Sequence, residues 1–412
     1  MTKKSDAPAI RFKGFSDAWE QRKFEEIAVR SSVICSDDTL PRVEYEDIVS
    51  GTGRLNKDIY AKQSSKSGIV FHQGDVLYGK LRPYLQNWLL PTFDGLAVGD
   101  FWVLQPQNAD SSFLYRLIQS RQFDEVANQS TGTKMPRADW KLMSKTVFSI
   151  PSNISEQAAI GTYFTALDNL ITLHQRKFEK LTNVKKSMLE KMFPQNGSSY
   201  PEIRFKGFTD PWEQRKFGEV FDCTVPNNTL SRAELSYDEG TVLNVHYGDV
   251  LIKYDSVLDV QKDDIPRIPH RCREDFNGAL LQDGDVIIAD TAEDETTGKA
   301  CEIGNLQGSA IVSGLHTMVC RPRNRMALGY LGYYLNSNAY HHQLLPLMQG
   351  IKVLSLSRSN IQKTSVSYPS AMKEQQLIAS YFSQLDNLIT LHQRELEKLQ
   401  NIKKSMLEKM FV

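Results

Sequence analysis

The sequence has 412 residues, of which 41% are hydrophobic, and its 49 lysines and arginines balance 49 aspartates and glutamates. This composition excludes a disordered chain and predicts two to four domains at roughly 100–200 residues each, while the balanced charge argues against binding nucleic acid by bulk charge alone. No apolar run approaches the ~20 residues that cross a bilayer and residues 1–9 lack the apolar centre of a signal peptide, so we expect a cytoplasmic protein without a membrane contact.

The first recognisable element is a short segment that occurs twice. Ile10–Phe24 reads IRFKGFSDAWEQRKF and Ile203–Phe217 reads IRFKGFTDPWEQRKF, so 13 of 15 positions are identical at an offset of 193. A second pair follows later, because Tyr163–Phe193 matches Tyr381–Phe411 at 25 of 31 positions with an offset of 218. The chain is therefore predicted to contain two copies of one unit, in which repeated segments surround dissimilar inserts, residues 25–162 and 218–380.

The first insert has the pattern of a mixed α/β domain. Short strands are predicted at 68–80, 95–105 and 144–150, and a helix with a serine cap at 111–127.

A long uninterrupted helix is predicted over residues 155–193. Its apolar residues recur in alternating steps of three and four, with His174 and Lys185 as polar members of the seam. At about 1.5 Å per residue the helix is about 60 Å long. The seam consists of Ile160, Phe164, Leu167, Ile171, Phe178, Leu181, Met188 and Met192, and a second stripe consists of Leu170, Leu173, Val184 and Leu189.

A linker rich in Pro, Gly and Ser at 194–202 leads into the second copy. Its insert is predicted to have strands at 241–252, 284–290 and 309–320 and a helix near 327–349. A second long helix at 373–412 repeats the seam, with His392 and Lys403 in the polar positions.

These elements predict an α+β protein with five segments and a pseudo-twofold repeat. Two mixed α/β recognition domains (1–154 and 203–372) are expected to be separated by an antiparallel coiled coil of the two spacer helices (155–193 and 373–412), with 194–202 as the linker. In this arrangement the paired helices would act as a ruler between the inserts. The alternative, that they are ordinary core helices of a bundle, stays open.

Motifs for catalysis are absent or incomplete. Residues 74–81 (GDVLYGKL) come close to a phosphate-binding loop, but Leu81 replaces the hydroxyl that would bind Mg²⁺. No Pro-Pro pair of an adenine methyltransferase motif occurs, and Asp139-Trp140-Lys141 has no convincing upstream acidic partner for a nuclease. The five cysteines are scattered and form no C-x-x-C pair, so neither a disulfide framework nor a metal site is predicted.

The repeated frame, the G-D-V strands, the Gly-x-Lys near each insert end and the E-Q-x-x-I-x-x-Y-F-x-x-L-D-N-L-I-T-L-H-Q helix together resemble the specificity subunit of type I restriction-modification systems. The resemblance covers nearly the whole chain. It implies a non-catalytic subunit whose two target recognition domains each read one half of a split site in double-stranded DNA. It also implies two methylation subunits and restriction subunits as partners, with S-adenosylmethionine, ATP and Mg²⁺ bound by those partners. A coiled-coil scaffold without DNA specificity is the alternative.

Candidate DNA contacts are residue types that read bases or bind phosphate. In the first insert they follow a predicted strand or lie in the Gly-containing loop 131–137: Lys80, Arg82, Tyr84, Gln86, Asn87, Lys134 and Arg137. In the second insert we predict Lys253, Tyr254, Arg271, Arg273, Lys352, Arg358 and Asn360. For docking the methylation subunits we expect repeated lysines on the long helices, namely Lys185, Lys186, Lys191, Lys403, Lys404 and Lys409.

Overall fold

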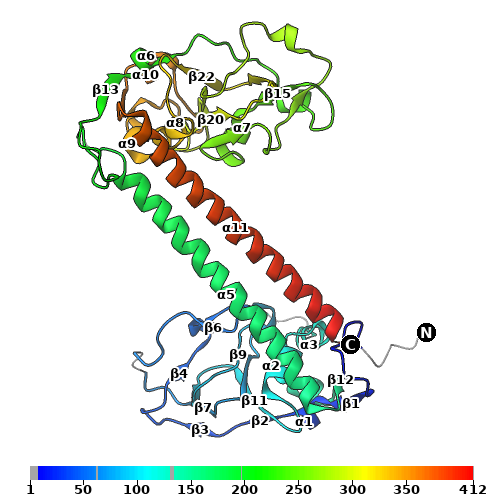
Figure 1. Ribbon diagram of the computed structural model, residues 1–412. Coiled ribbons are helices and arrows are strands. Elements are labelled where there is room, and N and C mark those ends of the chain that lie inside the picture. Colours follow the sequence, from blue (N-terminus) through cyan, green and yellow to red (C-terminus); the bar gives the residue numbers. More distant parts are fainter. Residues whose placement is uncertain (1–7, 62–63, 130–133, 196, 412) are drawn as a thin grey trace. The chain divides into compact units, whose positions relative to one another are not determined.

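The computed structural model describes residues 8–61, 64–129, 134–195 and 197–411. The chain forms two compact units, which we call the first unit (residues 1–176 and 393–412) and the second unit (residues 177–392). Two long helices, α5 (Ile154–Lys191) and α11 (Met372–Met410), each begin in one unit and end in the other. Each unit therefore contains the start of one long helix, the end of the other and one insert (Figure 1).

The first insert is built from small sheets that are mostly antiparallel. One sheet has the strand order β2-β11-β8-β9 and another the order β3-β7-β10-β4, in which β10 and β4 are parallel. Two further pairs are β1-β12 and β5-β6. The strands are β1 (Trp19–Lys23), β2 (Ala28–Ser31), β3 (Ile34–Cys35), β4 (Arg42–Val43), β5 (Ile48–Val49), β6 (Arg54–Leu55), β7 (Gly68–Phe71), β8 (Val76–Gly79), β9 (Trp88–Leu89), β10 (Gly95–Ala97), β11 (Phe101–Pro106) and β12 (Val147–Pro151). The short helices are α1 (Phe24–Ile27), α2 (Ser111–Leu117), α3 (Arg121–Ala127) and α4 (Trp140–Lys145).

The second insert has a larger central sheet, with the strand order β14-β22-β18-β20-β16. A three-stranded sheet, β17-β15-β21, and the pairs β19-β23 and β13-β24 complete it. The strands are β13 (Glu213–Lys216), β14 (Phe221–Asp222), β15 (Val242–Val245), β16 (Val257–Asp259), β17 (Arg267–Ile268), β18 (Val286–Ala289), β19 (Thr291–Ala292), β20 (Ala300–Gly304), β21 (Ala310–Ser313), β22 (Thr317–Pro322), β23 (Leu354–Ser355) and β24 (Ser365–Tyr368). The short helices are α6 (Phe217–Val220), α7 (Tyr247–Ile252), α8 (Tyr330–Leu335), α9 (Asn338–His341) and α10 (Arg358–Ile361).

The repeated segment at the start of each copy fastens the insert to its long helix through a buried carboxylate. In the first unit the Glu156 side chain is 1% exposed, and Arg11 donates to both of its oxygens over 2.6 Å. The indole Nε1 of Trp19 also donates to Glu156, over 3.3 Å. A buried carboxylate needs this full set of donors, since an isolated buried charge is costly. The second unit repeats the arrangement with Glu374, Arg204 and Trp212.

The next residue of each long helix fixes the end of the insert. In the first unit the Gln157 side chain donates to the carbonyl oxygen of Pro151 over 2.8 Å and accepts from the Asp110 amide over 2.9 Å. Gln375 makes the same pair of bonds, with the Pro369 carbonyl and the Ala327 amide. The strand pairs β1-β12 and β13-β24 close the inserts at the same place, because they join the repeated segment to the strand before the helix.

Within each unit the long helices pair antiparallel, as the sequence predicts. In the first unit Lys403 of α11 forms an ion pair with Asp168 of α5 at 2.7 Å, while Phe411 packs near Phe164. Higher numbers on one helix thus meet lower numbers on the other. In the second unit Lys185 pairs with Asp386 at 2.5 Å, which is the same interaction at an offset of 218.

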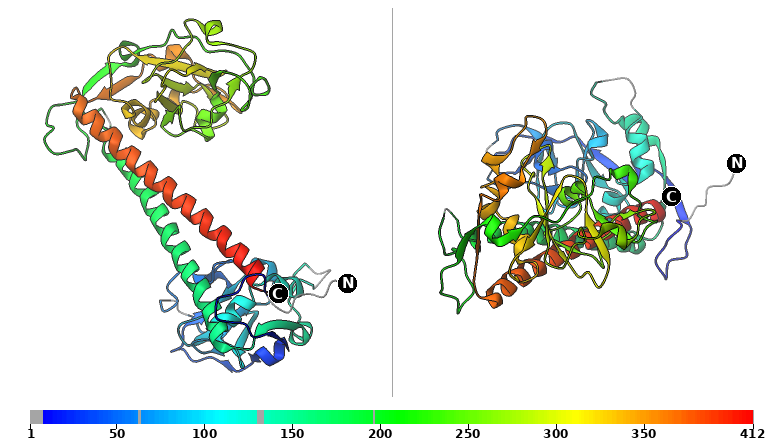
Figure 2. Two further views of the ribbon diagram at one scale, coloured as in Figure 1. Left: turned by 45° about the vertical axis from the view of Figure 1, so that its right-hand side comes forward. Right: turned by 90° about the horizontal axis from the view of Figure 1, so that it is seen from above.

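The core of each unit joins its insert to the ends of both helices. In the first unit Phe411 stacks on Phe113 of α2, and both views of Figure 2 show the end of α11 against this unit. In the second unit Phe193, which follows α5, stacks on Phe382 of α11 at 5.8 Å between ring centroids. The backbone repeats this closure, since the Ile10 amide donates to the Lys409 carbonyl (3.1 Å) as the Ile203 amide donates to the Lys191 carbonyl (2.9 Å).

Several elements of the first insert are shorter than predicted, because tight turns interrupt them. The predicted strand 68–80 is divided into β7 and β8 by a turn in which Gly74 has φ +92° and the Asp75 carboxylate accepts from the His72 amide. Strand 95–105 is likewise two strands, and 144–150 contains the end of α4 and most of β12. The predicted helix 111–127 is two helices, and Asp110 rather than Ser111 caps the first of them.

In the second insert, one predicted strand is wrong over half its length. Residues 242–245 form β15, but the next residues form helix α7, because the His246 ring nitrogen accepts from the Gly248 amide and caps a helix. The prediction at 309–320 corresponds to β21 and β22, and 284–290 to β18. The helix predicted near 327–349 is divided into α8, α9 and a 3₁₀ turn.

The lysines expected to dock partners are partly used inside the protein. Lys185 and Lys403 form the ion pairs between the long helices, and their side chains are only 22% and 17% exposed. Lys191 pairs with Glu202 on the surface at 2.7 Å. The expectation that Lys185 and Lys403 are free for a partner is therefore wrong.

The buried carboxylate predicts an unequal response to two arginine substitutions. Arg11→Ala leaves Glu156 buried with one remaining side-chain donor, so we expect the first unit to lose about 3–5 kcal/mol of unfolding free energy. Arg22→Ala removes a surface pair with Glu20 and is expected to cost about 0–1 kcal/mol. Denaturant unfolding of the two variants measures both losses, and equal losses would contradict the structural role of Glu156.

Candidate nucleic-acid interface

Two segments of the first insert that the sequence suggests separately as DNA contacts lie side by side. The Arg82 amide donates to the Pro136 carbonyl over 2.7 Å, and the Ala138 amide donates to the Lys80 carbonyl over 2.8 Å. An antiparallel bridge joins Leu81 to Arg137 between these two bonds. Residues 80–87 and 134–137 therefore form one surface, which we call the first reading surface.

Asp100 holds two of the cations of this surface in place. Its carboxylate pairs with Arg137 at 3.0 Å and with Lys80 at 3.4 Å. Partial burial opposes ionisation of Asp100, but the hydrogen bond from Arg137 and the charges of Arg137 and Lys80 bring its pKa below the ordinary value. The Tyr45 hydroxyl fixes the backbone below, because it donates to the Asp100 carbonyl (2.5 Å) and accepts from the Leu81 amide (3.0 Å).

The chain between Lys80 and Asn87 follows a tight, strained path. Arg82 and Gln86 have φ of 50° and 55°, and they flank a 3₁₀ turn at Pro83–Leu85. Such left-handed conformations are unfavourable for residues other than glycine, and they concentrate at functional sites. The amide of Gly51 donates to the Gln86 carbonyl over 3.0 Å and secures the far end of the turn.

Most of the residues predicted in this insert are available to a ligand. Arg82, Tyr84, Gln86, Lys134 and Arg137 are exposed, and Lys80 is partly exposed. The prediction that Asn87 contacts DNA is wrong, because Asn87 is buried and its carbonyl accepts from the Gly79 amide within the sheet. The predicted loop 131–137 is only partly assessed, because residues 131–133 lie outside the described residues.

The second insert repeats the same backbone pairing with different side chains. The Leu356 amide donates to the Asp290 carbonyl over 2.8 Å, and this bond corresponds to that between the Ala138 amide and the Lys80 carbonyl in the first insert. The pairing of β19 with β23 likewise corresponds to the bridge between Leu81 and Arg137. The preceding turn is also repeated, since the Asp285 carboxylate accepts from the Gln282 amide. Residues 290–297 and 349–355 thus form the counterpart, which we call the second reading surface.

Of the DNA contacts predicted in the second insert, only some lie on the second reading surface. Lys352 is exposed and lies on the second reading surface, at the position equivalent to Lys134. The prediction that Tyr254 contacts DNA is wrong, because its side chain is only 3% exposed and lies in the core. The Lys253 ammonium is tied to Asp264 at 2.9 Å and lies after helix α7 instead of the strand we predicted. Arg271 lies in the loop after β17, Arg273 begins a 3₁₀ turn at Arg273–Phe276, and Arg358 and Asn360 lie on α10.

Sequence reasoning missed the acidic character of the second reading surface. Residues 290–297 include Asp290, Glu293, Asp294 and Glu295. His316, with φ of 54°, lies 3.5 Å from the Asp290 carboxylate. The repeated Gly-Asp-Val could have indicated it. Residues 284–286 align with residues 74–76, and this alignment makes Asp290 of the second insert the equivalent of Lys80 in the first.

Comparison with known proteins decides the family. Residues 43–183 and 209–401 match the family described as type I restriction modification DNA specificity domain, once for each copy of the repeat. The chain belongs to this family. It is therefore a DNA-recognition subunit of a type I restriction-modification system, the scaffold alternative is not favoured, and catalysis belongs to the other subunits. Its partners are DNA and the methylation and restriction subunits of such a complex.

Individual members of the type I specificity family are distant in sequence. The chain is 22% identical to the type I restriction enzyme MjaVIII specificity subunit of Methanocaldococcus jannaschii over 346 residues, 78% of this chain and 77% of the relative. It is 25% identical to the Escherichia coli EcoDI specificity subunit over 185 residues, 42% of this chain and 41% of that subunit. The solved S subunit from M. genitalium has the same fold, with a TM-score of 0.57, 14% identity and coverage of 98% and 99%. A chain from a study of the assembly and conformational transition of the type I R-M system gives a TM-score of 0.50 at 18% identity, covering 94% and 96%.

Membrane attachment by a spanning helix finds no support in the described residues, because none of their helices is long and apolar enough to cross a bilayer.

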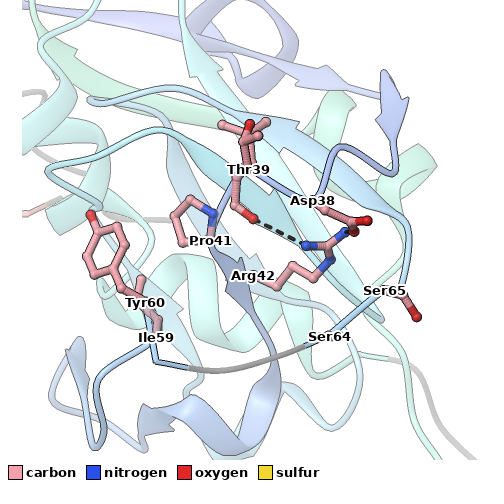
Figure 3. Close-up of a pocket in the computed structure, with 9 residues that line it drawn as sticks. Asp38, Thr39, Pro41, Arg42, Ile59, Tyr60, Ser64 and Ser65 are labelled. Carbon is pink, nitrogen blue, oxygen red and sulfur yellow. Dashed lines mark hydrogen bonds and ion pairs between the residues drawn. The ribbon is translucent and has the colours of Figure 1, made fainter.

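A cavity of about 570 Å³ in the first unit lies apart from these contacts (Figure 3). Arg42 lines it, but the guanidinium is fully used by its own surroundings. It donates to the carbonyl oxygens of Lys66 (2.7 Å) and Leu40 (3.3 Å) and pairs with Asp38 at 2.9 Å. Arg42 therefore stabilises the wall of the cavity and is not a base-reading group.

The pairing of Asp100 with two cations predicts its effect on discrimination. Asp100→Asn removes a charge and frees Lys80 and Arg137, so binding of the assembled complex to unrelated DNA should strengthen while the ratio of specific to unrelated binding falls about tenfold. Asp94→Asn is the matched control, since Asp94 pairs with His72 elsewhere in the same insert. Equilibrium titrations against cognate and scrambled duplexes measure the ratio, and equal effects of both variants would refute the role of Asp100.

Proposed function

We propose that each insert reads one half of a bipartite site in double-stranded DNA, and that the partner subunits perform adenine methylation and cleavage. The observation that carries this proposal is the repeated backbone pairing at the two reading surfaces. The frame places Lys80 and Asp290 at equivalent positions, yet the side chains around them differ in charge. Equivalent positions with different side chains suit two half-sites of different sequence.

In the first half-site we assign contacts to the exposed residues of the first reading surface. Arg82, Lys134 and Arg137 suit guanine or phosphate, and Gln86 suits adenine. In the second half-site we assign Lys352 and residues 290–297. The more distant Arg271, Arg273, Arg358 and Asn360 stay predictions. S-adenosylmethionine, ATP and Mg²⁺ are assigned to the partner subunits, because they provide the catalysis.

We further propose two methylation subunits per chain, one for each copy. Leu170 and Leu173 of α5 are 44% and 46% exposed, and their repeats Leu388 and Leu391 of α11 are 43% and 52% exposed. Exposed apolar groups at repeated positions are typical of protein interaction sites. Each unit contains one such pair, so each offers one equivalent surface.

Exchange of one insert tests the reading model. Replacing residues 25–150 by the equivalent insert of a relative should change one half-site and leave the other intact, because the two reading surfaces belong to different inserts. Replacing residues 218–368 is the matched exchange and should change the other half-site. Methylation mapping of genomic DNA reads both results, and an exchange that alters both half-sites, or neither, contradicts independent reading.

The stoichiometry is tested by paired substitutions. Leu170→Asp with Leu173→Asp should remove one of two methylation subunits, and Leu388→Asp with Leu391→Asp should remove one as well, because charge at the centre of an apolar contact opposes burial. Combining all four should remove both. Native mass spectrometry of the assembled complex counts the subunits, and a wild-type complex with a single methylation subunit would overturn the proposal.

A further inference from the structure

Three large apolar side chains are exposed on the first reading surface. Tyr84 and Leu85, in the 3₁₀ turn, are 57% and 38% exposed, and Met135 is 47% exposed. Met135 belongs to the facing segment, next to Pro136, whose carbonyl accepts from Arg82. We call these three residues the apolar tip. Within the described part of the chain, the Tyr84 side chain makes no hydrogen bond or ring contact, so it is available to a ligand.

The backbone below the tip is already ordered. The amides of Leu85 and Gln86 donate to the carbonyls of Arg82 and Pro83, each over 2.9 Å. Pro83 is buried, and its ring fixes the first φ of the turn. A ligand that contacts the tip therefore does not have to order this backbone, which is the condition for a rigid recognition element.

The surroundings of the tip point to DNA as the ligand. Arg82 and Lys134 are exposed beside it, and Lys80 and Arg137 lie on the same surface around Asp100. An apolar centre with a cationic rim matches a nucleic-acid duplex, in which apolar base faces lie between rows of phosphates. A protein partner would have to supply acidic groups around an apolar surface to match it equally.

We propose that Tyr84 and Leu85 insert between two stacked base pairs of the half-site read by the first insert and open that step. Met135 covers the edge of the inserted pair, and the cations bind the adjacent phosphates. Insertion is cheapest at pyrimidine–purine steps, which unstack most easily, so the recognised step belongs to that class. An opened step also lowers the cost of extruding a neighbouring base for methylation. This proposal rests on the proposed function, since it requires the first insert to contact DNA.

The test uses the complex of the full chain with its methylation subunits. Duplexes carry 2-aminopurine at each position, in turn, of the half-site that insert exchange assigns to residues 25–150. We expect the fluorescence to rise at one step on binding. Combining Tyr84→Ala with Leu85→Ala should abolish the rise and weaken binding roughly tenfold, the scale of one lost base–aromatic stack. A duplex with an abasic position at that step should restore most of the lost affinity.

Two further variants separate insertion from general damage. Tyr84→Phe keeps the ring and should keep the fluorescence rise. Tyr60→Ala removes another exposed aromatic of the same insert, 69% exposed but outside the tip, and should change neither signal nor affinity. The proposal is overturned if the wild-type complex gives no rise at any position, or if the double variant keeps it. Loss of a methylation subunit from the double variant in native mass spectra would also overturn it, by identifying the tip as a protein contact.

Failure of the insertion can be distinguished from failure of the proposed function. If the first insert did not read DNA, the exchange of residues 25–150 would leave the methylated sequence unchanged. If only the insertion is wrong, the exchange still changes one half-site, while the combined Tyr84→Ala and Leu85→Ala variant gives the same fluorescence as the unchanged complex.

Discussion

The buried carboxylate at the start of each long helix is the constraint on which the rest of the structure depends. Glu156 is almost completely buried, and Arg11 and Trp19 of the repeated segment supply its side-chain donors. Because removal of a donor would leave a charge in the core, the repeated segment is fixed against the helix. Gln157 then fixes the other end of the insert through the Pro151 carbonyl. Both ends of the insert are thus held by residues that recur in both copies, which explains how two copies with one frame tolerate such different inserts.

The pairing of the helices follows the same principle, with polar residues setting register in an apolar seam. Asp168 accepts from Lys403 of the other helix and from Arg116 of the insert. Its repeat, Asp386, accepts from Lys185 and from the Tyr333 hydroxyl. A shifted register would leave these partly buried charges unpaired, so each ion pair selects one antiparallel alignment. An arginine in one insert and a tyrosine in the other satisfy the same carboxylate, so the inserts share an acceptor without sharing a sequence.

Sequence reasoning succeeded where a signal repeats and failed where the structure depends on a helix cap or on distant partners. The long helices and the duplicated frame were predictable, because near-identical segments and a sustained apolar period leave few alternatives. Local patterns misled inside the inserts: Gly248-Asp249-Val250 is helical in α7, whereas Gly284-Asp285-Val286 leads into a strand. The difference is the cap provided by His246, which a strand pattern does not reveal. The reading surfaces were harder still, since they exist only where Lys80 meets Ala138 and where Asp290 meets Leu356, some 60 residues away in each case.

The opposite charge of the two reading surfaces limits how the chain can bind DNA. The first offers Lys80, Arg82, Lys134 and Arg137 around one aspartate, whereas the second contains Asp290, Glu293, Asp294 and Glu295 and a single lysine, Lys352. Phosphates attract the first surface and repel the second, and the chain as a whole has no net charge to compensate. Carboxylates suit contacts with cytosine amino groups, but they supply no affinity for the backbone. The second half-site must therefore take its phosphate contacts from cations outside this surface, and Arg271, Arg273 and Arg358 of the same insert are candidates alongside the partner subunits. The two reading surfaces therefore cannot contribute equally to the affinity for the DNA backbone, and the second insert needs cations from outside its reading surface.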